Sequence, residues 1–361
     1  MIAHEHPDEI CQQKLTGARR ASSGRWLFPT RLRAERKWDA MARKRQTQYS
    51  GIGGQAVLEG VMMKNNAKYA VAVRKPDGEI DVQVDEYKGV CGDKAFAKLP
   101  LIRGVFAFVD SLILGMRVTM HSASFYEEDE TAQKTDKKAS ESKSEDIMMG
   151  ITVVISVIIA VALFMLLPFW LSDLLGKYIR NASLVAILEG VFRILIFVGY
   201  IAAISLMKDI RRLYMYHGAE HKCINCIERG RPLNVRDVMR SSRQHKRCGT
   251  SFLLFVVLVS VIVFFFIRVD NMALKLALRL LLIPVIAGIS YELIRLAGRC
   301  DNILIRILSA PGMWMQRLTT KEPDEEMVKV AIASVEAVFD WKAYLVENFG
   351  YTNDAFEEED L

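Results

Sequence analysis

The sequence predicts a mainly α-helical membrane protein: a four-helix transmembrane bundle with a small cytoplasmic β-hairpin-containing element and cytoplasmic amphipathic helices. Two observations predict this class. The 361-residue chain has a mean hydropathy of +0.16 although 25% of its residues are charged, so its apolar residues must be segregated. They form four runs, each near the roughly 20 residues that cross a bilayer core. The runs lie at 147–171, 183–207, 251–267 and 272–294.

The distribution of basic residues predicts the orientation of the chain. Lys and Arg are concentrated between the second and third runs, within 208–250, whereas the connection between the first two runs has only Lys177 and Arg180. Because cytoplasmic loops are enriched in Lys and Arg, we expect a multi-pass cell-membrane protein with both termini in the cytoplasm. Contact with anionic lipid explains the formal charge of +6, so the lipid bilayer is the expected partner and nucleic acid is not.

Composition separates the bundle, 147–294, from two segments that we expect to be disordered. Residues 1–48 form a basic extension without sustained apolar periodicity. Residues 124–146 form a linker rich in acidic residues, Ser and Lys, with almost no apolar content.

Three further segments have patterns of secondary structure. Residues 49–97 predict a small cytoplasmic β/α element, since two alternating runs flank Pro76–Gly78 as in a β-hairpin. The apolar stretch 98–123 has charges at sevenfold spacing, which favours an amphipathic or membrane-associated helix. Residues 295–361 predict a cytoplasmic C-terminal region with an amphipathic helix that opens at Pro323.

The segment 208–250 contains a group of residues typical of a metal site. His217 and His221 are four residues apart, so on a helix they share one face, and Glu220 lies on an adjoining face. This HxxEH pattern is the inverse of the HExxH zinc helix, in which a glutamate deprotonates bound water. His245 and Cys248 lie at the other end of the same connection. His217, His221, His245 and Cys248 together would make a closed site. His217, His221 and one of His245 or Cys248, with Glu220 as base, would make an open one; zinc is the expected metal.

Two alternatives remain open for this segment. Cys223 and Cys226 form a CxxC pair that could supply thiolates in place of the other ligands. In the second alternative no metal binds, and the polar side chains cap helices and contact lipid phosphates on a basic surface.

Polar residues also interrupt the apolar runs. Glu189 and Arg193 are four residues apart in the second run, which favours a buried ion pair over an ion or proton path. Lys275 and Arg279 lie in the first turns of the fourth run, where they can extend outward to the interface. The glycines of 53–64 lack the ending of a phosphate-binding loop, so we interpret them as tight turns or close packing.

Six blocks, in order, resemble a bacterial integral-membrane family of unknown function, the YqhQ family, some of whose members are labelled as predicted metal-dependent enzymes. The blocks are GGQAVLEGVMMK (53–64), LPLIRGVFAFVDSLILGM (99–116), YHGAEHK (216–222), RCGTSF (247–252), PVIAGISYELIRLAG (284–298) and PGMWMQRLTTKEPD (311–324). The resemblance covers about residues 50–345 and implies a cell-membrane protein.

The family motif carries onto five residues of this chain: His217, Glu220, His221, His245 and Cys248. The chain departs from the family pattern at two positions, with Cys at 223 and with Lys246 where proline often follows the histidine. These departures argue against an essential role for Cys223.

Three functional hypotheses follow. The first is a metal-dependent hydrolase at the cytoplasmic membrane face that acts on a peptide or a lipid-linked group, with Glu220 activating water. The second is a non-catalytic membrane scaffold that uses a structural metal to join two helix ends and recruits a membrane-protein or peptide partner. The third, weaker hypothesis is a transporter that uses Glu189 and Arg193.

Overall fold

The chain divides into two units, one of residues 49–227 with 232–341 and one of residues 1–48 with 228–231 and 342–361. The computed structural model describes residues 47–92, 94–131, 141–267, 269, 271–299, 303–352 and 356, with two short strands at 19–20 and 26–27. Most of the extension 1–48, predicted to be disordered, lies outside the described residues. The exceptions are residues 47–48 and the two strands, β1 (Arg19–Arg20) and β2 (Trp26–Leu27).

The larger unit contains a four-stranded antiparallel meander in the order β3-β4-β5-β6. Its strands are β3 (Gly53–Val57), β4 (Gly60–Asn65), β5 (Lys68–Arg74) and β6 (Ile80–Glu86). The predicted hairpin is confirmed, because β5 pairs with β6 across the turn at Pro76–Gly78. The strands β3 and β4 were not predicted individually. Most of β4 is buried on both faces, so its sequence lacks the alternation that marks a half-exposed strand.

Helices cover both faces of this sheet. Helix α3 (Ile102–Thr131) packs Leu114 and Val118 on one face, against the side chains of Val57, Val71 and Val73. Helix α13 (Glu325–Glu336) covers the other face. Both helices agree with the amphipathic helices that the sequence predicts near these positions.

Helices occupy both ends of the segment predicted as a linker, 124–146. Helix α3 continues to Thr131, and α4 (Glu141–Val161) begins ten residues later; residues 132–140 lie outside the described residues. Glutamate is a good helix former, which explains how α3 extends through a polar stretch.

Three helical segments are long and apolar enough to cross a membrane: Gly150–Gly176, Ala182–Ile204 and Ala273–Ala297. The first comprises α4, a π-helical turn η2 (Ala162–Leu166) and α5 (Leu167–Gly176). The second is α6 (Ala182–Ile204), and the third comprises most of α10 (Met272–Leu281) and α11 (Ile283–Arg299). The four-span prediction is therefore shown for three segments. The remaining one, 251–267, corresponds to α9 (Gly249–Phe265), which is apolar but shorter.

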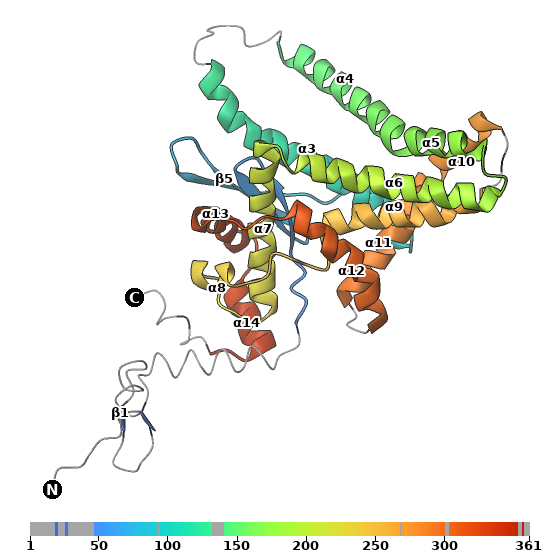
Figure 1. Ribbon diagram of the computed structural model, residues 1–361. Helices are drawn as coiled ribbons and strands as arrows, with labels where there is room; N and C mark the ends of the chain where they lie inside the picture. The colour runs from blue at the N-terminus through green and yellow to red at the C-terminus, as the bar shows by residue number, and fades with distance from the viewer. Residues whose placement is uncertain are drawn as a thin grey trace. The chain divides into compact units, whose positions relative to one another are not determined.

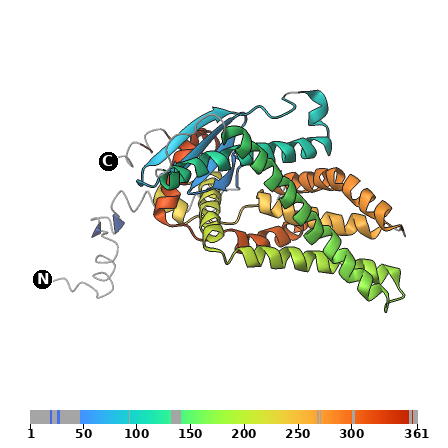
Figure 2. The same ribbon diagram turned by 90° about the horizontal axis from the view of Figure 1, so that it is seen from above.

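Helix α9 lies among α6, α11 and α12 (Ile303–Thr319) (Figures 1 and 2). The α5–α6 and α9–α10 connections lie at one end of these helices, and α7 (Lys208–Glu228) lies at the other. The short helices η1 (Ala95–Lys98) and α8 (Val235–Met239) complete this unit.

The predicted ion pair within the second run is confirmed: Arg193 Nη2 lies 2.6 Å from Glu189 Oε1. The outward position predicted for Arg279 is wrong. Its side chain is buried and pairs with Glu189, with Nη1 2.8 Å from Oε1. Burying a guanidinium is unfavourable unless it is paired, and Glu189 supplies that pairing. The ion pair therefore outweighs the contact between the Arg279 side chain and lipid that an outward position would give.

The smaller unit includes α14 (Trp341–Phe349) except for its first residue. The Tyr351 hydroxyl donates a hydrogen bond to the carbonyl oxygen of Gly230 at 2.6 Å. Gly230 has a φ of +71°, and the Phe349 ring occupies the space that its Cβ would fill, so glycine is needed there on both counts.

Candidate metal centre

Helix α7 presents two imidazole rings on one face, as the HxxEH spacing predicts. The ring centroids of His217 and His221 are 4.4 Å apart. His217 Nδ1 lies 2.9 Å from the carbonyl oxygen of Thr319. His221 Nδ1 lies 2.7 Å from the carbonyl oxygen of Arg243. Because a carbonyl oxygen only accepts hydrogen bonds, Nδ1 carries the hydrogen in both rings, and Nε2 presents its lone pair when the ring is neutral.

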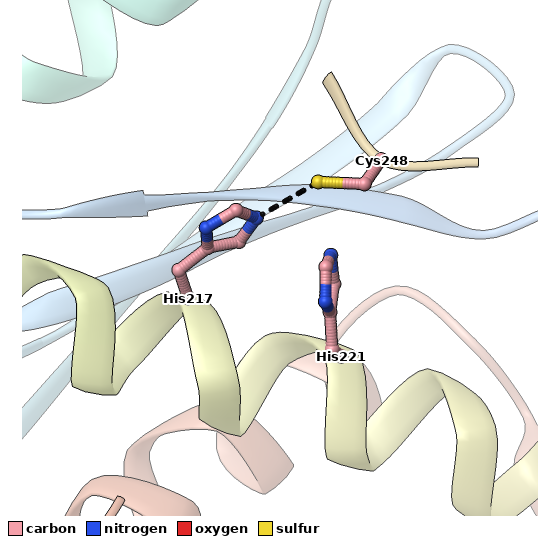
Figure 3. Close-up of side chains that lie close together, drawn as sticks. All are labelled: His217, His221 and Cys248. Carbon is pink, nitrogen blue, oxygen red and sulfur yellow. Dashed lines mark hydrogen bonds between the residues drawn. The ribbon is translucent and has the colours of Figure 1, made fainter. Parts of the chain in front are cut away.

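Cys248 completes a group of three ligand atoms. It is the N-cap residue of α9, and its Sγ lies 3.2 Å from His217 Nε2 (Figure 3). Ligand atoms of His217, His221 and Cys248 all lie within 4.8 Å of one another. The thiol also lies 3.1 Å from the Thr250 hydroxyl, which helps to fix its position.

The group fits a tetrahedral zinc ion in donor chemistry, and one pair of its ligand atoms fits in distance. Two imidazole nitrogens and one thiolate form a common zinc ligand set, and typical bond lengths place neighbouring ligand atoms roughly 3.3–3.6 Å apart. The observed 3.2 Å between Cys248 Sγ and His217 Nε2 is close to this range. Hydrogen bonds from Nδ1 to backbone carbonyls are the usual way in which proteins orient metal-binding imidazoles.

The electrostatics of the group favour a thiolate. Burial alone would raise the pKa of Cys248, but the imidazoles of His217 and His221 outweigh it and hold this pKa well below its usual range. Burial lowers the pKa of His217, but the Cys248 thiolate outweighs it and raises the pKa to about 9. Without a metal, the two side chains therefore form a thiolate–imidazolium pair, and a cation would take the place of the proton.

Glu220 is buried beside the three ligand side chains. Burial raises the pKa of its carboxyl, while His217 and His221 partly offset this effect. The backbone N–H of Gly54 donates a hydrogen bond to the carboxyl group. The carboxyl group is thus held by one hydrogen bond, and its Oε2 is buried without a hydrogen-bond partner among the described residues.

Gly54 allows strand β3 to approach helix α7 closely. A Cβ atom at position 54 would lie 2.6 Å from the carbonyl oxygen of Met62 and 2.9 Å from Glu220 Cγ. The close-packing interpretation of the glycines in 53–64 is therefore confirmed for Gly54. Glu59 of the same block does not join the three ligands. It pairs with the Arg212 guanidinium and accepts a hydrogen bond from the Tyr216 hydroxyl at 3.1 Å.

His245 lies close to the three ligands. Its ring centroid is 5.8 Å from that of His221, and it does not belong to the group of ligand atoms within 4.8 Å. Its backbone is fixed by Gln316, whose side-chain amide accepts from His245 N and donates to His245 O, both at 2.8 Å. The geometry therefore favours Cys248 over His245 as the third ligand.

Cys223 and Cys226 do not join the described group either. Both are buried, and the Cys226 thiol donates to the carbonyl oxygen of Pro232 at 3.2 Å. Burial raises the pKa of Cys223 well above its usual range. These properties are those of core thiols.

Two further residues of α7, which the sequence did not single out, hold the loop that approaches the site. Lys222 Nζ donates to the carbonyl oxygens of Met239 and Ser241 at 2.7 and 3.0 Å. Asn225 Nδ2 donates to those of Ser242 and Gln244 at 2.7 and 3.0 Å. Lys222 and Asn225 are three residues apart on the helix, but their acceptors are backbone atoms and have no signature in the sequence.

The fold and the site define a mainly helical, membrane-associated protein with a candidate metal centre beside its apolar helices. Comparison with known proteins then gives the family: residues 99–341 match the model of a protein family of unknown function, DUF1385, and the chain belongs to that family. It is also 36% identical over 302 residues to "Uncharacterized protein YqhQ" of Bacillus subtilis (strain 168), which covers 82% of this chain and 94% of the relative. No solved structure matches the chain. The resemblance to the YqhQ family is therefore confirmed.

Proposed function

We propose that the protein is a metal-dependent hydrolase of the cytoplasmic membrane face, with His217, His221 and Cys248 as zinc ligands and Glu220 as general base. The observation that carries the proposal is the orientation of the two imidazoles. Both rings are held through Nδ1 by backbone carbonyls, which directs Nε2 toward the buried sulfur of Cys248. Ordinary helix capping or core packing does not require this arrangement.

Three protein ligands rather than four support an open site. A zinc ion in such a site supplies a Lewis acid with a free coordination position. Glu220 fits the second role, because Gly54 fixes the carboxyl group while Oε2 has no partner among the described residues. This oxygen can accept a proton from a water molecule and return it to a leaving group. The raised pKa of Glu220, due first to burial, brings the carboxyl closer to the range useful for that exchange.

The position of the group supports a substrate that is held at the membrane surface. Cys248 lies at the start of the apolar helix α9, so the ligands sit at the end of the membrane helices. Gly53 and Gly54 are exposed on the β3 side, whereas Glu220 behind them is buried, so a substrate would have to approach the carboxyl group through a movement of β3. A peptide segment or a lipid-linked group close to the bilayer is the substrate class that this position favours.

The proposal includes α9 as a fourth span and both termini in the cytoplasm. The 17 residues of α9 give a helix about 25 Å long, slightly shorter than the thickness of the hydrocarbon core. Neighbouring helices surround α9, so it needs little lipid contact of its own. Protease digestion of a C-terminal tag in sealed inside-out membrane vesicles tests the orientation: the tag should be cleaved, and protection of the tag would contradict it.

Elemental analysis of the detergent-purified protein tests the metal site. We expect about one zinc per chain, lost in His217→Ala, His221→Ala and Cys248→Ala. His245→Ala should keep its metal if the site has three ligands and lose it if the site is closed by a fourth. Sub-stoichiometric metal that is equal in all variants would remove the hydrolase proposal.

Glu220→Gln separates the hydrolase from the scaffold. In a hydrolase, this variant keeps its zinc and loses turnover, which is measured as peptides or lipid fragments released from membranes by wild type and absent with the variant. In a scaffold with a structural metal, Glu220→Gln is silent, and loss of any ligand unfolds the region around α7.

A further inference from the structure

A second polar cluster lies within the membrane helices, on α6 and α10. Both oxygens of Glu189 are engaged by arginines: Arg279 contacts each of them at 2.8 Å, and Arg193 Nη2 lies 2.6 Å from Oε1. All three side chains are buried. One carboxylate therefore faces two guanidinium groups, and the cluster has one positive charge in excess.

The remaining contacts of the guanidinium groups are neutral. Arg193 Nη1 donates to the Ser260 hydroxyl at 3.4 Å, and both arginines lie over the Phe264 ring, with guanidinium-to-centroid distances of 4.8 and 5.0 Å. The Nε atoms of Arg193 and Arg279 are buried, and neither has a hydrogen-bond partner in the described part of the chain. Among the described residues, Glu189 is the sole carboxylate within ion-pair distance of either arginine. An excess charge among apolar helices is unfavourable unless a further anion neutralises it.

A small pocket adjoins this cluster on the side of Arg279. It is lined by Met165, Leu166, Phe169, Lys275, Leu276 and Arg279. Its volume of about 10 Å³ has room for one oxygen-sized group. Lys275 is partly exposed at the pocket, with Nζ 4.9 Å from the centre of the Phe169 ring, and it has no ion pair with a described residue.

Two irregular helices meet at this pocket. Met165 and Leu166 belong to the π-helical turn η2, and α10, which contributes Lys275 and Arg279, is interrupted at Leu282 before α11 begins. Single π-helical turns and interrupted membrane helices are both frequent at binding sites, because they open space between otherwise packed helices. Charge, pocket and helix geometry thus coincide at one place.

We propose that this pocket binds the phosphate group of an anionic lipid. One phosphate oxygen enters the pocket beside Arg279, and the Lys275 ammonium contacts the rest of the headgroup. The single negative charge of a phosphodiester neutralises the excess charge of the cluster, and the apolar lining residues contact the glycerol and acyl parts. The lining residues belong to η2, α5 and α10, and Figure 1 shows α5 and α10 at the end of the helices away from α7. The lipid site is therefore separate from the metal centre and does not depend on the proposed hydrolase activity.

Thermal denaturation of the full chain in micelles of a nonionic, phosphate-free detergent tests the proposal, because a ligand that binds the folded protein raises its denaturation midpoint. Phosphatidylglycerol and inorganic phosphate are titrated separately. The variants are Lys275→Gln, Lys275→Arg and, as a matched control, Lys177→Gln, which removes an exposed positive charge at the same end of the helices.

We expect phosphatidylglycerol to raise the midpoint of wild type, Lys275→Arg and Lys177→Gln at similar concentrations. Lys275→Gln should need about tenfold more lipid, as is typical for loss of one charged hydrogen bond. An equal response of all four proteins, or no response, would overturn the proposal. A Lys275-dependent response to inorganic phosphate alone would assign the pocket to free phosphate and overturn the lipid assignment.

Discussion

Replacement of Gly54 by alanine gives the sharpest test of how the sheet supports Glu220. The added Cβ would lie 2.6 Å from the Met62 carbonyl oxygen, 2.9 Å from Glu220 Cγ and 2.9 Å from Met63 Sδ. Ordinary contacts between such atoms are roughly 3.5 Å or longer. The Met63 thioether can rotate away, but the Met62 carbonyl belongs to strand β4. The variant can therefore relax only if strand β3 or Glu220 moves.

We expect Gly54→Ala to lower the free energy of unfolding by about 1–3 kcal/mol, the usual effect of overpacking a tight site. The neighbouring variant Gly53→Ala is the matched control, because a Cβ at position 53 meets no atom within 4 Å. Gly53→Ala should be neutral or slightly stabilising, since alanine restricts the unfolded chain.

The assay is thermal denaturation of both variants in detergent, combined with elemental analysis. The ligands do not touch Gly54, so the Gly54→Ala variant should keep its metal. If the proposed function holds, this variant should also lose turnover, as Glu220→Gln does. Equal denaturation midpoints and equal turnover of the two glycine variants would refute the close approach of β3 to Glu220.

Three further predictions concern single side chains. Cys248→Ser should lose zinc in elemental analysis, whereas Cys223→Ser, a substitution of a buried thiol outside the ligand group, should retain it. Asn225→Ala leaves two backbone carbonyls of the neighbouring loop without their donor, so zinc affinity measured by competition with a chelator should fall about 10–100-fold; unchanged affinity would show that the loop does not depend on this amide. Glu189→Gln leaves two buried arginines without a counter-charge and should lower stability by about 3–5 kcal/mol in thermal denaturation; a change below about 1 kcal/mol would indicate that water or lipid already compensates them.

The features that the sequence predicts well are local ones. The four-residue spacing of His217 and His221 fixes their common face once α7 is helical, and Cys248 approaches them because it starts the next long apolar helix. The family motif also includes His245, which lies outside the group of ligand atoms within 4.8 Å of one another, and the motif alone does not distinguish it from Cys248. Packing between helices decides which face of a helix points inward, and the sequence of one helix does not reveal this. The outward position predicted for Arg279 was wrong for the same reason.

The contacts that tune the site are not local and could not be predicted. Thr319 and Arg243 orient the imidazoles through their carbonyl oxygens, and a backbone atom leaves no trace in the identity of the residue. Gly54 lies 166 positions before Glu220, so their contact depends on how the sheet packs against α7. The glycines of 53–64 indicate that another part of the chain packs closely against this backbone, but they do not identify that part.

The ligands and the proposed base depend on different parts of the fold. Cys248 begins α9, and Thr319, which orients His217, ends α12, a helix that packs along α9. Glu220 is instead fixed by Gly54 of the sheet. A change in the sheet should therefore disturb the base and spare the metal, and a change at the start of α9 should do the reverse. Because a purely structural metal would not need a carboxyl group positioned independently of its ligands, this separation favours the hydrolase over the scaffold.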